Sequence, residues 1–157
     1  MNYKGIYYEI LNEYGNYLAE VLEDLPLDDY LWSITRGEIH LLDENGVTGR
    51  FLFEDADKFL QGSTLYSMAK NNTYYMVFAT IGAYRKSEEL EYIRTYNDFL
   101  QSECQIIVIV ADCSEVIIIC KDERLVLDIY NRVKFKECEK VKLIDEKDLI
   151  SNIYILD

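Results

Sequence analysis

Two short apolar runs, separated by three turn-forming residues, dominate the second half of this chain. The runs cover residues 105–111 and 116–120, and Asp112-Cys113-Ser114 lies between them. Neither run reaches the roughly 20 residues that a membrane-spanning helix needs. Both are rich in β-branched residues and apolar at consecutive positions, which is typical of strands buried on both faces. Because so short a loop joins antiparallel neighbours, the sequence predicts a central buried hairpin at about 104–121.

Turn-forming residues divide the first half of the chain into short elements. Pro26 ends a helix expected at 14–25, which Asn12 caps. Arg36-Gly37 predicts a tight hairpin, and Asn45-Gly46 supplies the pair favoured by a type I′ turn. Together these turns predict an antiparallel meander over about residues 30–53.

Along the whole chain the predicted strands cluster in runs, with a few helices between the runs, and do not alternate with helices as in a βαβ fold. Thr95 and Asp98 form a capping box, with Asp where Glu is more usual. Asp122 begins a helix with a regular apolar face. We therefore predict one α+β domain over residues 1–157, with a mainly antiparallel sheet packed by two or three helices. The other expected elements are strands at 4–10, 73–83, 140–144 and 152–156 and a helix at 63–70.

The charge of the chain is strongly negative and uneven. The net charge is −13, and residues 1–60 carry 13 acidic and 4 basic side chains. A field of this sign repels nucleic-acid phosphates and anionic lipids and attracts cationic partners. We expect no nucleic-acid binding and no membrane association. The acidity fits a basic protein partner, and it fits a role in solubility equally well.

Tyrosine is abundant, with 14 residues in the chain. Tyrosine is enriched at protein interfaces because it offers rigid area and a polar tip, although tyrosines in strands are ordinarily core residues. The leading hypothesis is a non-enzymatic interaction module with an acidic, tyrosine-bearing surface. One version is an immunity protein that blocks a cationic toxin domain. The candidate partner-binding residues are Tyr14, Tyr17, Glu23, Asp24, Asp28, Asp29, Tyr30, Glu54, Asp55 and Asp57.

Few residues offer catalytic or metal-binding chemistry. His40 is the single histidine, and Cys113 lies near Asp112 and Glu115, whose charges work against a reactive thiolate. The chain has no zinc-type Cys and His spacing and no glycine-rich phosphate loop. We therefore assign no catalytic, cofactor-binding or metal-binding residue. The alternative hypothesis is a small enzyme or small-ligand-binding protein with a cleft near His40 or Cys113.

The N-terminal sequence and the cysteines bear on the compartment. No basic segment followed by an apolar stretch opens the chain, so a secretory signal is not expected. The four cysteines are widely spaced, which favours free thiols in a reducing cytoplasm.

Four segments resemble a known group of proteins. They are GIYYEILNEYGNYLAEVLE, YLWSI, NTYYMVFATIGAY and VIVADCSEVIIICKD. In these segments the chain resembles a family of uncharacterised single-domain proteins from Bacillus-like Gram-positive bacteria. The resemblance implies a cytoplasmic bacterial protein and assigns no functional residues.

Overall fold

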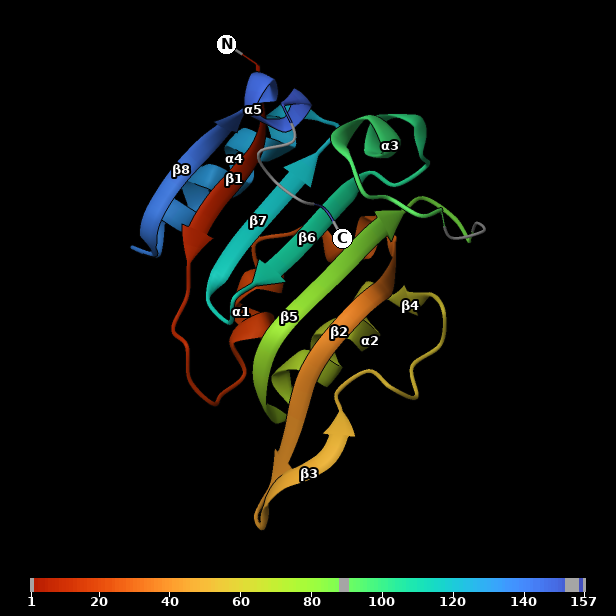
Figure 1. Ribbon diagram of the computed structural model, residues 1–157, viewed down its shortest axis with the longest axis vertical. Helices are drawn as coiled ribbons and strands as arrows, with labels where there is room; N and C mark the ends of the chain where they lie inside the picture. Colours follow the sequence, from red (N-terminus) through yellow and green to blue (C-terminus); the bar gives the residue numbers. More distant parts are fainter. Residues whose placement is uncertain (1, 88–90, 152–155, 157) are drawn as a thin grey trace.

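A single antiparallel sheet with helices on both faces organises the molecule (Figure 1). The structure is a computed structural model and describes residues 2–87, 91–151 and 156. Within them the strand order is β3-β2-β5-β6-β7-β1-β8, and β4 also pairs with β2. The α+β class is confirmed. The elements are β1 (Tyr3–Glu9), α1 (Tyr17–Leu22), the 3-10 turn η1 (Leu27–Asp29), β2 (Leu31–Asp43), β3 (Gly46–Phe51), β4 (Leu60–Gln61), α2 (Gly62–Lys70), β5 (Thr73–Tyr84), α3 (Tyr96–Gln101), β6 (Ile106–Ala111), β7 (Glu115–Cys120), α4 (Glu123–Phe135), β8 (Glu139–Asp145) and α5 (Glu146–Ile150).

The predicted central hairpin is confirmed as β6 and β7, which lie at the middle of the sheet. Ile106 pairs with Cys120 at the open end of the hairpin. Neighbouring side chains of a strand point to opposite faces of its sheet. Ile118 accordingly lies in the core on one face, and Ile117 lies in the core on the other. Both faces of the hairpin are therefore buried.

Helices cover the two faces unequally. On one face, which we call the back face, α1, α2 and α4 bury the larger core, and they lie behind the sheet in Figure 1. On the other, the front face, α3, α5 and Leu156 bury a smaller core. These covering segments lie over the upper end of the front face, and in the described residues no helix covers its lower half (Figure 1).

The first strand occupies an interior place in the sheet. β1 pairs with β7 on one side and with β8 on the other, both in antiparallel fashion. Ile6 and Tyr8 of β1 point into the core of the back face. β8 forms the edge of the sheet, where an edge strand was expected at 140–144.

The hairpin predicted at Arg36-Gly37 is wrong, because residues 31–43 form the single strand β2. Arg36 and Gly37 lie opposite Thr80 and Ala79 of β5, so both belong to the ladder between the two strands. The register shifts just before Arg36, so the residues that suggested a turn adjoin a β-bulge. Long-range pairing with β5 thus outweighs the local turn preference.

Two other boundaries also move. The type I′ turn predicted at Asn45-Gly46 is wrong: the turn after β2 consists of Glu44 and Asn45, and Gly46, with a φ of 103°, pairs with Asp43 at the start of β3. The first helix covers Tyr17–Leu22 rather than 14–25, so it ends before Pro26 is reached. It also begins later than expected, and Asn12 does not cap it. The reason is an isolated bridge in which Gly15 and Tyr74 exchange backbone hydrogen bonds of 3.1 and 3.0 Å.

The remaining helices largely agree with the sequence patterns. Both hydrogen bonds of the predicted capping box between Thr95 and Asp98 are present at the start of α3. The Asp122 side chain caps α4 by accepting from the Arg124 N–H, and α2 lies at the helix expected over 63–70. α5 was not expected. Most of the strand expected at 152–156 lies outside the described residues.

Candidate functional site

The 3-10 turn η1 holds two exposed carboxylates against the start of α2. Pro26 lacks the N–H that a continuing helix needs, and the chain turns there. A Cβ at Gly62 would lie 2.1 Å from the Leu27 carbonyl oxygen, so glycine permits this close approach of η1 to α2. Asp28 and Asp29 follow Leu27 in the turn, and both are exposed.

η1 and α2 together form an open concavity, which we call the acidic concavity, with a volume of about 530 Å³. Among the described residues, neither Asp28 nor Asp29 forms an ion pair. Their charges are therefore available to a ligand that enters the concavity. The lining residues are Leu25, Pro26, Leu27, Asp28, Asp29, Gly62, Ser63 and Tyr66.

Tyr66 connects the acidic concavity to the end of α1. Its hydroxyl donates a 2.8 Å hydrogen bond to Glu23 Oε1, and this bond raises the pKa of Tyr66. The Lys70 ammonium lies 5.5 Å from the centre of the Tyr66 ring. Tyr66 thus links Glu23 to the concavity that contains Asp28 and Asp29, although the sequence did not indicate Tyr66 as a site residue. Only the contact between α1 and α2 reveals Tyr66, because its position in the sequence carries no distinguishing signal.

Asp24 lies apart from this exposed group. Only 5% of Asp24 is exposed, and its Oδ2 forms a 2.9 Å ion pair with Lys136 Nζ. Lys136 also donates to the Glu20 carbonyl at 2.7 Å, and Arg132 donates to the Asp24 carbonyl at 3.0 Å. Arg132 of α4 and Lys136, which follows α4, therefore donate to backbone carbonyls at the end of α1, where helical hydrogen-bond donors are lacking. The expectation that the Asp24 carboxylate lies on the surface is wrong, because Asp24 is buried at the contact between the ends of α1 and α4.

A buried tyrosine lies close to this ion pair. Burial raises the pKa of Tyr8 well above its ordinary value, and the negative charge of Asp24 raises it further. The Tyr8 hydroxyl is buried and has no hydrogen-bond partner among the described residues.

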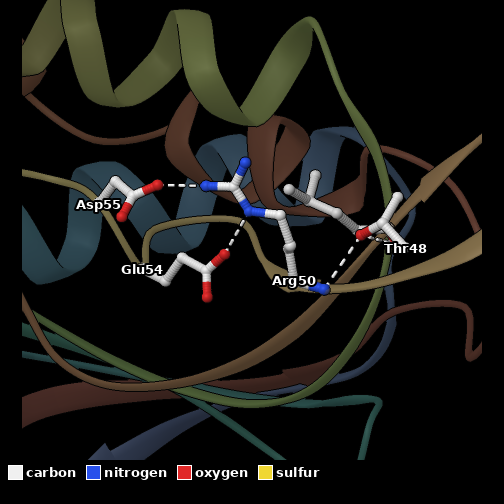
Figure 2. A network of polar contacts seen from close by, with 5 residues as sticks. Thr48, Arg50, Glu54 and Asp55 are labelled. Carbon is white, nitrogen blue, oxygen red and sulfur yellow. Dashed lines mark hydrogen bonds and ion pairs between the residues drawn. The ribbon is translucent and has the colours of Figure 1, made fainter.

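A second group of candidate carboxylates surrounds Arg50 (Figure 2). Arg50 Nε lies 2.5 Å from Glu54 Oε1, and its Nη2 contacts Asp55 Oδ2. The Arg50 N–H donates to Thr48 Oγ1 at 3.1 Å, which fixes the base of the side chain. The single positive charge of the guanidinium offsets one of the two negative charges of Glu54 and Asp55, and both carboxylates already contact it, so they are less available to a basic partner than Asp28 and Asp29 are. Asp57, two residues after Asp55 in the sequence, is also exposed.

The candidate tyrosines have separate surroundings. The Tyr14 ring packs against Tyr75 with centroids 5.3 Å apart, and Tyr30 packs edge-on against Trp32 at 6.2 Å. The Tyr17 hydroxyl donates to the Glu13 carboxylate. The structure therefore places Asp28 and Asp29 in the acidic concavity and joins Glu23 to it through Tyr66, and the other candidates lie outside its lining.

The residues of the alternative hypothesis lie in different settings. His40 packs edge-on against Phe51 at 5.1 Å, and its Nε2 lies 3.7 Å from Glu38 Oε2. Cys113 lines an open concavity of about 480 Å³ on the sheet together with Arg36 and Phe78. A cleft thus exists near Cys113, and none of its lining residues is a histidine.

Metal-binding clusters and membrane-spanning helices are both absent from the part of the chain that the structure describes. There, no three His, Cys, Asp or Glu side chains converge in a way that could hold a metal ion. No helix in the same ranges is long and apolar enough to span a membrane.

The fold and the concavity define an acidic α+β protein built on one antiparallel sheet. The chain belongs to a family described as a protein of unknown function (DUF2691), which it matches over residues 3–155. It is similar to the uncharacterized protein YncE of Bacillus subtilis (strain 168), with 29% identity over 153 residues that cover 97% of this chain and 99% of that protein. No solved structure matches the chain. The resemblance to an uncharacterised bacterial family is confirmed.

Proposed function

We propose that this protein is a non-enzymatic interaction module that binds a basic segment of another protein in the acidic concavity. The observation that supports this function is the pairing of two exposed carboxylates, Asp28 and Asp29, with the apolar lining of Leu25, Pro26 and Leu27. Lysine and arginine side chains combine an apolar stem with a cationic head, so they complement both parts of this lining.

The charge distribution favours the same class of partner. Residues 1–60 carry a net charge of −9, from 13 acidic and 4 basic side chains, which accelerates encounter with a cationic protein. The finer version of the proposal is an immunity-like protein that blocks a cationic toxin domain. The same field disfavours nucleic acid and anionic membranes as partners.

Affinity capture from a lysate of the native cell, at low and then at high salt, tests the proposal. The test variant is Asp28→Lys with Asp29→Lys. The matched control is Glu44→Lys with Asp128→Lys, which makes the same change of charge at two exposed positions outside the lining of the concavity. Circular dichroism confirms that both variants are folded.

We expect the wild type and the control to retain the same basic protein, which high salt then elutes, and we expect the test variant to lose it. Equal loss in both variants would show that total charge rather than the concavity binds the partner. Retention by the test variant, or capture of no basic protein by the wild type, would contradict the proposal.

A further inference from the structure

The front face contains a small, partly open cavity, distinct from the acidic concavity, with a volume of about 80 Å³. It lies under the segment 91–93 and Leu156, which cover the strands β2, β5 and β6 at this point. The side chains that enclose it are mainly apolar, and they include Ile93, Ile107 and Leu156.

The space at the floor of the cavity depends on Gly82. A Cβ at this position would lie 3.1 Å from Cys104 Sγ and 3.2 Å from the Tyr84 ring. The Cys104 thiol donates to the Ile106 carbonyl at 3.2 Å, and burial raises the pKa of Cys104 to about 11. The thiol therefore stays neutral at physiological pH, and the floor suits an uncharged group.

Arg36 supplies a cation beside this apolar space. It lines the cavity and also the adjoining open concavity that contains Cys113. Its guanidinium stacks over the Phe78 ring at 4.7 Å, and no hydrogen bond or ion pair in the described ranges uses its N–H groups. A guanidinium that stacks on an aromatic ring keeps the N–H groups at its edge free, and two of these N–H groups can bind the two oxygens of a carboxylate.

We infer that this site binds a small branched carboxylic acid, with its apolar end in the cavity and its carboxylate on Arg36. A volume of 80 Å³ is between two and three times the roughly 30 Å³ that one water occupies in the liquid, so the cavity suits a group no larger than a small branched alkyl such as isopropyl. The chain's net charge of −13 opposes any anion, so the attraction must be local to Arg36. Glu91 also lines the cavity and adds a repulsion near the same point.

Nuclear magnetic resonance of isoleucine methyl groups tests the inference on the whole protein. The ligand is isovalerate, and the matched probe is isovaleramide, which has a similar shape and no charge. We expect the methyl signals of Ile93 and Ile107 to shift in a saturable manner with isovalerate at concentrations up to the order of 10 mM, in the range of weak small-molecule binding. We expect isovaleramide to bind about tenfold more weakly, because it cannot form the charged bidentate pair.

Three variants test which charged side chains contribute to the binding of isovalerate. Arg36→Gln should weaken isovalerate binding about tenfold and leave isovaleramide binding unchanged, whereas Arg124→Gln, at an exposed arginine of α4, should change neither. Glu91→Gln should strengthen isovalerate binding. Equal affinity for the acid and the amide, an unchanged Arg36→Gln variant, or the absence of saturable shifts at Ile93 and Ile107 would overturn the inference.

Discussion

Asp24 shows how one side chain joins two helices that are far apart in the sequence. Its carboxylate is buried, and its partner Lys136 lies 112 residues further along the chain. The same lysine also donates to the Glu20 carbonyl, so one ammonium group binds both a side chain and a backbone carbonyl at the end of α1. The contact joins the end of α1 to the end of α4 on the back face, where α4 packs against β1.

We predict that Asp24→Asn lowers the free energy of unfolding by about 2 kcal/mol, measured by urea denaturation at neutral pH. The substitution leaves the Lys136 ammonium without its anion. The loss is smaller than for a fully enclosed pair, because 32% of the Lys136 side chain remains exposed to water.

A double-mutant cycle with Lys136→Met separates the ion pair from other effects. We expect the double variant to be more stable than the sum of the two single losses predicts. Additive losses would show that Asp24 stabilises the helix end without Lys136.

Sequence patterns located part of the candidate site. The density of acidic residues pointed to Asp28 and Asp29 because charge is a local property of the sequence. It could not separate them from Asp24, whose burial depends on Lys136, 112 residues away. Tyr66 was missed for the same reason, since its hydrogen bond to Glu23 spans 43 residues.

The turn between β6 and β7 combines backbone strain with tertiary support. Asp112 and Cys113 have φ values of 48° and 70°, which lie in the left-handed region that residues with a Cβ disfavour. The Cys113 N–H donates to the Val77 carbonyl of β5 at 3.0 Å, and the Ser114 N–H closes the turn onto the Ala111 carbonyl at 3.2 Å. These bonds hold the turn against its strain.

We predict that Cys113→Gly raises the free energy of unfolding by about 0.5–1 kcal/mol relative to Cys113→Ala. Glycine removes the left-handed penalty, and part of the gain is lost to the greater freedom of glycine in the unfolded chain. The alanine variant is the control, because it also lacks the thiol. Thermal or urea denaturation measures the difference, and an alanine variant as stable as the glycine variant would contradict the role of strain.

Elements with local signals were predicted, and elements that depend on distant pairing were not. The capping box of α3 is a local motif, and the N–H groups of Arg94 and Thr95 bind Asp98 and hold its pKa below its usual value. The central hairpin was equally local, because its apolar runs and its turn adjoin. The continuous strand β2 was not predicted, because the backbone at Arg36-Gly37 is extended only as a result of pairing with β5, which lies far along the sequence.

At the scale of the whole molecule, the sheet separates two cores of different size. The back core is enclosed by α1, α2 and α4, and the front core is covered over only part of the face (Figure 1). Ile118 is fully buried on the back face, and Ile117, its neighbour in β7, is 8% exposed on the front face. The two residues therefore form a matched pair, with the same side chain on the same strand.

We predict that Ile118→Ala costs about 4 kcal/mol of unfolding free energy and Ile117→Ala about 2 kcal/mol, measured by urea denaturation. The back face cannot collapse around the missing atoms, because helices and strands enclose it. The front face relaxes more easily near its open half. Equal costs, or a larger cost at Ile117, would show that the two cores are packed alike.

The place of β1 between β7 and β8 has a consequence for how the protein is made. A ribosome completes β1 at Glu9 but reaches the start of β7 only at Glu115 and the end of β8 only at Asp145. At about 5–20 residues per second, β1 waits on the order of ten seconds for its neighbours. A nascent chain shorter than 115 residues leaves β1 without either partner and β6 with an open edge, which is a template for aggregation. The sheet therefore closes around its first strand only after β8 has been synthesised.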